Sequence, residues 1–212
     1  GRQSWLEEAM GFCIQHEVVL AHDNPYVDLA IEGEAPVLLN CPGWREWGIE
    51  FFSFSKAWNM GGFRLGFAIG AEPIIRALKR CKSVVDFNQS LALQEGAITA
   101  LLYAQNWPDQ ILEIYRERRD KTLPALNKLG WQVPSPSMAM YIWMPIPKWS
   151  TDRGWNDETF AAELLAETGI ALTPGRGFGS GGEGWLRLAL VRPLDDLEVA
   201  VARIGSWWHA HS

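Results

Sequence analysis

Apolar and polar residues repeat along the chain with two different periods, and the alternation of these periods predicts an α/β fold. Short apolar runs with strand character lie at 18–21, 49–55 and 63–69. Apolar residues at helical spacing occupy 72–81, 91–103 and 111–129, and Pro108 is expected to separate the last two helices. The residues before the first strand have the pattern of an amphipathic helix. Strands that alternate with helices are typical of a sheet covered by helices.

The pattern after Gly130 differs in composition and predicts a second, smaller α/β unit. Strands are expected at 138–144, 170–173 and 185–191. Helices are expected at 157–168 and 194–208. We place the boundary inside the long helix near Glu113, which predicts two domains, 1–112 and 113–212.

Composition and charge restrict the classes of protein to which the chain can belong. Of its 212 residues, 48% are hydrophobic and 21% are charged, as in ordinary globular proteins. Nineteen Lys and Arg against 25 Asp and Glu leave a net charge of −6, which disfavours a nucleic-acid partner. The first apolar run is too short to span a membrane. The 3 cysteines have no C-x-x-C spacing and the 4 histidines form no ligand pattern, so no metal site is expected and a reducing, cytoplasmic location fits best.

Lys56 is the strongest candidate for chemistry, because it follows a predicted strand in the motif S-F-S-K at 53–56. A lysine that emerges from a buried strand is partly desolvated, which lowers its pKa and frees the amine for Schiff-base formation. Two hydroxyl groups flank it, and Arg64 follows a Gly-Gly turn at 61–62. These groups predict an anion site suited to a phosphate. An isolated lysine at a strand end is more often an ordinary surface residue.

Asp23 and Tyr26 form a second polar pair, in the motif D-N-P-Y at 23–26. The motif follows the first predicted strand, and Asn-Pro is a turn signal. Both side chains are therefore expected at the carboxyl end of a buried strand, where open α/β sheets bind their ligands. Taken alone, the motif is more often only a turn.

Together these motifs resemble the C-terminal half of fold-type I, class I and II pyridoxal-phosphate aminotransferases. The matching segments are D-N-P-Y at 23–26, S-F-S-K at 53–56, N-M-G-G-F-R-L-G at 59–66, P-G-R-G-F-G at 174–179 and G-E-G-W-L-R-L-A at 182–189. The resemblance implies that 1–112 is the C-terminal part of the large cofactor domain, with a mostly parallel sheet and helices on both faces. It implies that 113–212 is the small C-terminal α/β domain.

The resemblance also implies roles for individual residues around pyridoxal phosphate. Lys56 would form the Schiff base with the cofactor and then act as general acid and base in the proton shift. Asp23 would pair with the pyridine nitrogen and keep it protonated, which makes the ring an electron sink. Tyr26 would hydrogen-bond the 3-oxygen.

Anion contacts complete the implied site. Ser53 and Arg64 would hold the phosphate of the cofactor, and Ser55 would assist. Arg187, in the segment W-L-R-L at 185–188, would bind the α-carboxylate of the substrate, a role suited to a planar, bidentate guanidinium. A solvent-facing arginine on an edge strand is the alternative that the alternation of leucines around it leaves open.

The implied activity is a ping-pong transfer of an amino group between an amino acid and a 2-oxo acid, in a homodimer. Family members are roughly twice as long, and their N-terminal half supplies further parts of the site. We therefore expect this chain to be an incomplete copy that is weak or inactive alone.

The stretch from Tyr26 to Gly70 resembles the branch that acts on LL-diaminopimelate or N-succinyl-diaminopimelate, which predicts the substrate. The alanine and aspartate aminotransferases resemble this stretch nearly as well. Two other functions remain open: a pyridoxal-phosphate-dependent C–S lyase, and a non-catalytic aminotransferase-like domain of a regulator.

Overall fold

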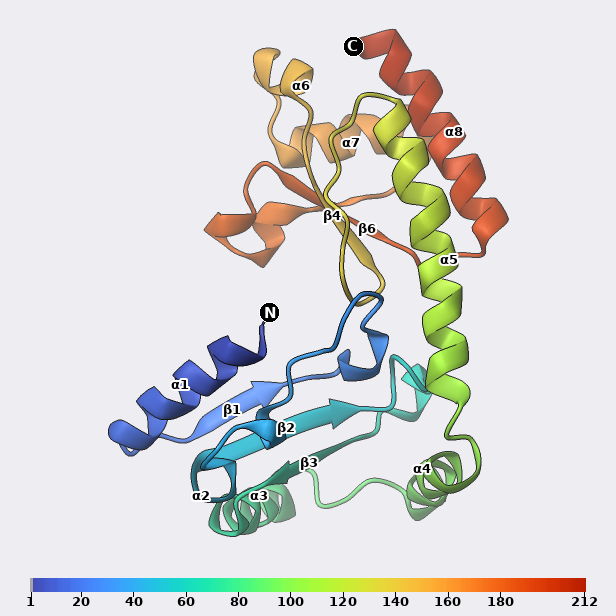
Figure 1. Cartoon of the computed structure of the whole chain (residues 1–212). Coiled ribbons are helices and arrows are strands. Elements are labelled where there is room, and N and C mark those ends of the chain that lie inside the picture. Colours follow the sequence, from blue (N-terminus) through green and yellow to red (C-terminus); the bar gives the residue numbers. More distant parts are fainter. Residues whose placement is uncertain (1) are drawn as a thin grey trace. The chain divides into compact units, whose positions relative to one another are not determined.

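The computed structural model describes residues 2–212, which form two compact units (Figure 1). Unit 1 ends at Leu112, and unit 2 runs from Glu113 to Ser212. The division lies inside the long helix α5 (Trp107–Lys128). Each unit is an α/β structure with a three-stranded sheet of its own.

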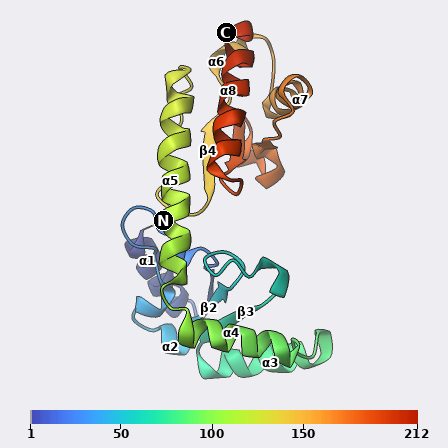
Figure 2. The ribbon, with the colours of Figure 1, turned by 90° about the vertical axis from the view of Figure 1, so that its right-hand side faces the viewer.

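Unit 1 is built around the central strand β2 (Gly48–Ser53). The flanking strands are β1 (Leu20–Asp23), which pairs with it in parallel, and β3 (Gly66–Gly70), which pairs with it antiparallel. The helices are α1 (Gln3–Gln15), α2 (Trp44–Trp47), α3 (Glu72–Val85) and α4 (Leu91–Tyr103). Helix α1 lies beside β1 and α3 beside β3; Figure 2 shows α3 and α4 along their length.

Unit 2 holds an antiparallel sheet with the strand order β4-β6-β5. Its strands are β4 (Tyr141–Pro145), β5 (Thr173–Pro174) and β6 (Trp185–Ala189). Its further helices are α6 (Lys148–Asp152), α7 (Asp157–Thr168) and α8 (Leu194–His211). Short 3-10 helices of the chain lie at Val27–Leu29, Leu38–Asn40, Gly61–Phe63, Gly175–Phe178 and Ser180–Gly182.

Burial in β4 and β6 alternates residue by residue, so one face of this sheet is the core of unit 2. That face carries Ile142 and Met144 from β4 and Leu186 and Leu188 from β6. Helices α7 and α8 add apolar side chains to the same core, among them Phe160, Leu164, Ile204 and Trp208. The opposite face of β4 and β6 is half-buried, and it carries the polar and aromatic residues described below.

Several element boundaries differ from those predicted, each for a local backbone reason. Strand β3 begins at Gly66, because Arg64 adopts a left-handed conformation with φ of 52° that no strand accommodates. Strand β4 begins at Tyr141, because Ala139 has φ of 66°. Helices α4 and α5 are separate, as predicted, and Pro108 lies in the first turn of α5, where its missing N–H needs no partner.

The expectation that the first strand is buried is wrong. Val18 and Val19 lie before β1 and are 49% and 44% exposed, and within β1 Ala21 and Asp23 are also exposed. Among the described residues β1 pairs with β2 alone, so one edge of the strand has no neighbouring strand.

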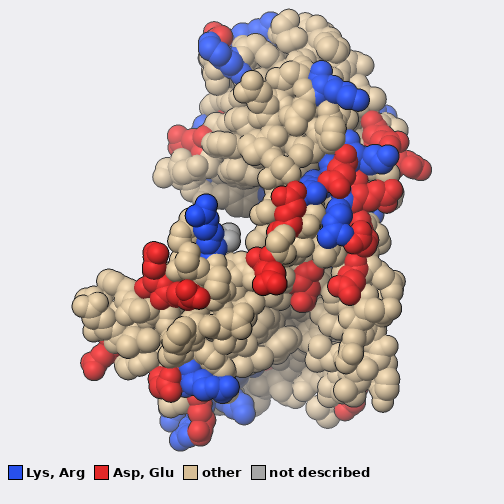
Figure 3. All heavy atoms as spheres, viewed as in Figure 1, with Lys and Arg blue, Asp and Glu red and all other residues tan. Residues whose placement is uncertain are grey.

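Charged and apolar side chains are distributed unevenly over the surface. Acidic and basic side chains are mixed along α5 (Figure 3), as expected for a solvated helix face.

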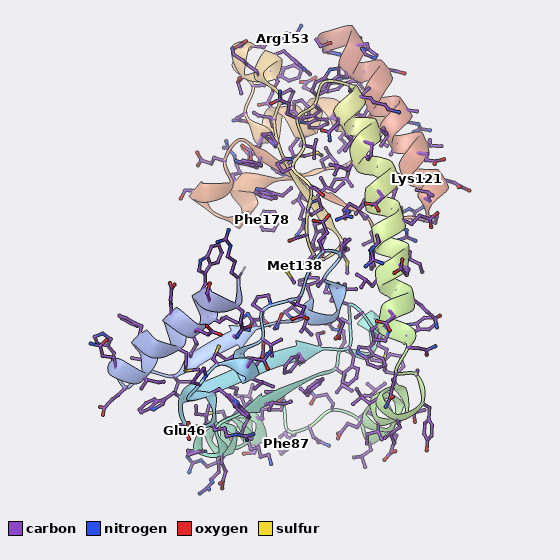
Figure 4. The ribbon with its side chains drawn as sticks, viewed as in Figure 1. Glu46, Phe87, Lys121, Met138, Arg153 and Phe178 are labelled. Atoms are coloured by element: carbon purple, nitrogen blue, oxygen red, sulfur yellow. The ribbon has the colours of Figure 1, made fainter. Side chains whose placement is uncertain are left out.

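Phe87, labelled in Figure 4, lies between α3 and α4 and is 78% exposed. Within residues 2–212, no helix is both long enough and apolar enough to cross a membrane.

Candidate functional site

Lys56 lies three residues beyond the end of β2, in a turn anchored by its neighbour Phe54. The Phe54 side chain is buried, and its backbone N–H donates to Leu65 O (3.2 Å) while its carbonyl accepts from Met60 N (3.1 Å). This anchoring leaves Lys56 half-buried. Its Nζ atom lies 5.4 Å from the ring centre of Tyr26, so the ammonium contacts the aromatic face.

Asp23 is the last residue of β1, and its side chain shares a sheet face with Ser53. Asp23 pairs with Phe51 in the parallel register, and residues two apart in a strand face the same way. Asp23 is exposed and Ser53 is half-buried. The backbone N–H of Asn24 continues the ladder with a bond to Phe51 O (2.9 Å). The two strand ends that carry candidate residues are thus held side by side.

Ser53 is the last residue of β2, and Ser55 and Arg64 lie in the turns that follow. Ser53 Oγ accepts a hydrogen bond from the backbone N–H of Ser55 (3.1 Å), which fixes the first turn. The exposed Arg64 donates through Nη1 to Gly61 O (3.2 Å), and among the described residues it makes no hydrogen bond to either serine. A non-glycine residue in the left-handed region is unusual and is often found at binding sites.

Glu50 is a fully buried carboxylate in β2 that sequence reasoning missed. It accepts hydrogen bonds from His22 Nδ1 (2.8 Å), from Asn24 Nδ2 (2.9 Å) and from the backbone N–H of Leu39 (3.2 Å). A second bond from Asn24 Nδ2 reaches Pro36 O (3.0 Å). The signal in the sequence is an acidic residue inside the apolar strand I-E-F-F-S-F at 49–54, which requires buried partners.

This network fixes the backbone on both sides of Asp23. His22 and Asn24 flank Asp23, and both donate to the Glu50 carboxylate. Side chains alternate along a strand, so the network lies on the sheet face opposite Asp23. The face of β1 that carries Asp23 remains available to a ligand.

Arg187 lies in the middle of β6 in unit 2, on the half-buried face of the sheet. Its guanidinium carbon is 4.5 Å from the ring centre of Tyr141 and 4.6 Å from that of Phe178. The Nε–H group is buried and has no hydrogen-bond partner among the described residues. A buried donor without a partner costs free energy, so this group is suited to an anionic ligand.

The glycine-rich loop before β6, residues 175–184, is held by Asp157, which is fully buried at the start of α7. Its carboxylate accepts from Arg176 N (2.9 Å), Nε (3.1 Å) and Nη2 (3.0 Å), and from Gly184 N (3.3 Å). Burial by itself raises the pKa of Asp157, but the hydrogen bonds from Arg176 and Gly184 outweigh it and hold the pKa below its usual value.

Six of the seven predicted site residues therefore belong to unit 1, and Arg187 belongs to unit 2. Within unit 1, contacts join Lys56 to Tyr26 and Ser53 to Ser55. Two groups of unit 2 were not singled out from the sequence: Phe178, which contacts Arg187, and the Asp157 carboxylate, which holds the loop that carries Phe178.

Comparison with known proteins identifies the family. The family model for aminotransferase class I and II matches residues 4–204. The chain belongs to this family, and its α/β fold is that of a fold-type I transferase.

Individual relatives carry more particular names. The LL-diaminopimelate aminotransferase of Dehalococcoides mccartyi is 40% identical over 204 residues, which is 96% of this chain and 51% of the relative. That of Moorella thermoacetica is 36% identical over 201 residues, 94% of this chain and 50% of the relative. The solved structure of a probable N-succinyldiaminopimelate aminotransferase from Thermus thermophilus has a TM-score of 0.88 at 41% identity, covering 97% of this chain and 54% of that one. The chain thus spans about half the length of the curated relatives it matches.

Replacing Glu50 by Ala is predicted to lower the free energy of unfolding by about 3 kcal/mol, because it removes the acceptor of His22 and Leu39 and leaves the buried Asn24 amide with Pro36 O alone. Urea unfolding followed by tryptophan fluorescence measures this. The matched control is Glu46→Ala on α2, an exposed acidic residue labelled in Figure 4, which should change stability by no more than about 0.5 kcal/mol. A loss below about 1 kcal/mol for Glu50→Ala would contradict the role of the network.

Asp157 is predicted to make unit 2 sensitive to acid. Its pKa is lower in the folded chain than the value of about 3.9 expected when unfolded, so the unfolded state binds the proton first. The stabilisation is complete above the unfolded pKa and is lost as the pH falls through the lowered, folded pKa. Asp157→Asn should reduce the free energy of unfolding at neutral pH by about 3 kcal/mol. Below about pH 5, the free energy of unfolding of this variant should depend less on pH than that of the unaltered chain.

Thermal unfolding at acidic to neutral pH measures this effect, with Asp152→Asn as the control. Asp152 pairs with Lys148 in solvent, its side chain being 60% exposed. If Asp157→Asn loses stability at acidic pH as steeply as the unaltered chain does, Asp157 is not the source of the acid sensitivity.

Proposed function

We propose that this chain is the lysine-bearing part of a pyridoxal-phosphate-dependent aminotransferase that moves an amino group between an amino acid and a 2-oxo acid. The observation that carries the proposal is the half-buried Lys56 beyond the end of β2, with its Nζ 5.4 Å from the Tyr26 ring centre. Membership of the aminotransferase family supports it.

The side chains of unit 1 fit this cofactor in their chemistry. A carboxylate and a hydroxyl group end two adjacent strands, and a phenol, an amine, a second hydroxyl group and a guanidinium lie in the turns that follow these strands. The face of β1 that carries Asp23 is left available, since the Glu50 network occupies the opposite face. When bound, pyridoxal phosphate supplies an electron sink that makes the Cα–H bond of an amino acid acidic.

Each residue has one task in this proposal. The Lys56 amine would hold the cofactor covalently and would carry the proton that leaves and re-enters the substrate. The Asp23 carboxylate would accept a hydrogen bond from the pyridine N–H, and Tyr26 would donate to the 3-oxygen.

The phosphate would be bound by the end of β2 and the turns that follow it. Ser53, Ser55 and Arg64 supply its donors, with Arg64 contributing the positive charge. Arg187 binds the carboxylate of the substrate, and its buried Nε–H without a partner among the described residues supports that role.

The remaining proposals concern the whole enzyme. Residues 1–112 form part of its large cofactor domain and 113–212 its small domain; the compact units divide at the same position. The proposed substrate is LL-diaminopimelate or N-succinyl-diaminopimelate, as in the names of the relatives. The proposed assembly is a homodimer in the cytoplasm, a reducing compartment that suits the free thiols Cys13, Cys41 and Cys81.

The variant Lys56→Ala tests the proposal. Pyridoxal phosphate added to the unaltered chain should give the visible absorption band of a lysine-linked cofactor, and the variant should lose that band because it lacks the amine. Lys148→Ala is the matched control, since the Lys148 side chain is 85% exposed and pairs with Asp152. A band that survives in Lys56→Ala would refute the assignment of the lysine.

A further inference from the structure

The half-buried face of β4 and β6 carries one charged residue among aromatic rings. Tyr141 and Trp143 project from β4, and Trp185 and Arg187 from β6. Trp143 and Trp185 stack with ring centres 6.0 Å apart and an angle of 7° between their planes. Within these two strands Arg187 is the sole ionisable group besides the Tyr141 phenol.

The rings around Arg187 contact its guanidinium without accepting a hydrogen bond from Nε–H, which has no partner among residues 2–212. Tyr141 and Phe178 contact the guanidinium at 4.5 and 4.6 Å from its central carbon. A cation–π contact uses the charge of the guanidinium and none of its N–H groups. The contacts therefore restrict the orientation of the side chain while Nε–H, buried and without a partner among the described residues, still requires an acceptor.

Phe178 differs from the other rings because it belongs to the glycine-rich loop and not to the sheet. It is 53% exposed, and its ring packs edge-on against Trp143 with centres 5.6 Å apart. Figure 4 labels it on the segment between β5 and β6. The position of the Phe178 ring beside Arg187 therefore depends on the contacts that fix the conformation of the loop.

Two features fix that loop. Asp157 accepts hydrogen bonds from Arg176 near the beginning of the loop and from Gly184 at its end. The two sides of the loop also approach closely, since a Cβ atom on Gly175 would lie 2.1 Å from Gly182 O. A loop pinned at both ends and tight between them holds Phe178 over a small range of positions.

We propose that Phe178 is a positioning residue for Arg187, and that the Asp157–Arg176 ion pair acts on Arg187 through Phe178. Tyr141 from the sheet and Phe178 from the loop hold the guanidinium in one orientation, in which its Nε–H has no hydrogen-bond partner among the described residues. This inference rests on the proposed role of Arg187 as the substrate-carboxylate ligand, and it adds the residues that hold it ready.

The test uses the Arg187 Nε–H signal in nitrogen-15 NMR spectra of the full chain, assigned with Arg187→Lys. Succinate is the probe, because it carries carboxylates and no amine and so cannot react with Lys56. In the unaltered chain the signal should be displaced by the nearby rings and should move further as succinate is added.

Three variants of the loop separate positioning from folding. Phe178→Ala should reduce the ring-induced displacement, leaving the part due to Tyr141, and should weaken succinate binding roughly tenfold, as expected for loss of a partly desolvated cation–π contact. Phe178→Tyr retains a ring and should bind within about twofold of the unaltered chain. Arg176→Ala should weaken binding in the same direction as Phe178→Ala, because the loop loses its anchor.

The controls are Phe87→Ala, which removes an exposed ring from unit 1, and Arg192→Ala, which removes an exposed arginine paired with Asp196. Both should leave the Arg187 signal and the succinate affinity unchanged. Circular dichroism checks that every variant is folded.

The proposal is overturned if Phe178→Ala, folded, keeps the Nε–H displacement and the succinate affinity. The proposal is also overturned if Phe178→Tyr, although it retains a ring, shows the same losses of Nε–H displacement and succinate affinity as Phe178→Ala. If succinate leaves the Arg187 signal of the unaltered chain in place, the carboxylate role of Arg187 fails, while the visible band that depends on Lys56 is judged independently.

Discussion

A carboxylate that leaves water must find hydrogen-bond donors inside the protein, and both units of this chain are organised around that requirement. Glu50 and Asp157 are the two fully buried acidic side chains of the described residues. Each lies in a strand or a helix, and each accepts hydrogen bonds from segments that are distant in sequence. His22 is 28 residues from Glu50, and Arg176 is 19 residues from Asp157. The loops have to adopt the conformation that supplies those donors.

The two networks have the same consequence for the candidate sites. In unit 1 the donors flank Asp23, so satisfying Glu50 also sets the end of β1 beside the end of β2. In unit 2 the donors bracket the glycine-rich loop, so satisfying Asp157 also sets the ring that contacts Arg187. Buried acidic groups with no direct part in the proposed ligand binding thus determine where the ligand-binding groups lie.

Much of the fold follows from the sequence pattern. The helices at 91–103 and 157–168 have their predicted limits, because apolar spacing and flanking turn residues agree there. Strand ends were less accessible to prediction, since the left-handed backbone at Arg64 and Ala139 depends on local turns that the apolar pattern does not encode.

The candidate site was predictable only in part, for a related reason. Lys56 and Asp23 stand out because short polar motifs follow strands. Glu50 was visible as an acid inside an apolar strand, but its partners are set by tertiary packing. Phe178 carried no signal, since its contact with Arg187 exists only once the loop is pinned.

Lys56 is proposed to be the residue of this chain that binds pyridoxal phosphate covalently. Borohydride reduction after incubation with the cofactor, followed by peptide mass spectrometry, tests it directly among the 6 lysines. We expect one dominant pyridoxyl adduct, on the peptide that contains Lys56. Labelling spread evenly over the lysines, or concentrated on another one, would contradict it.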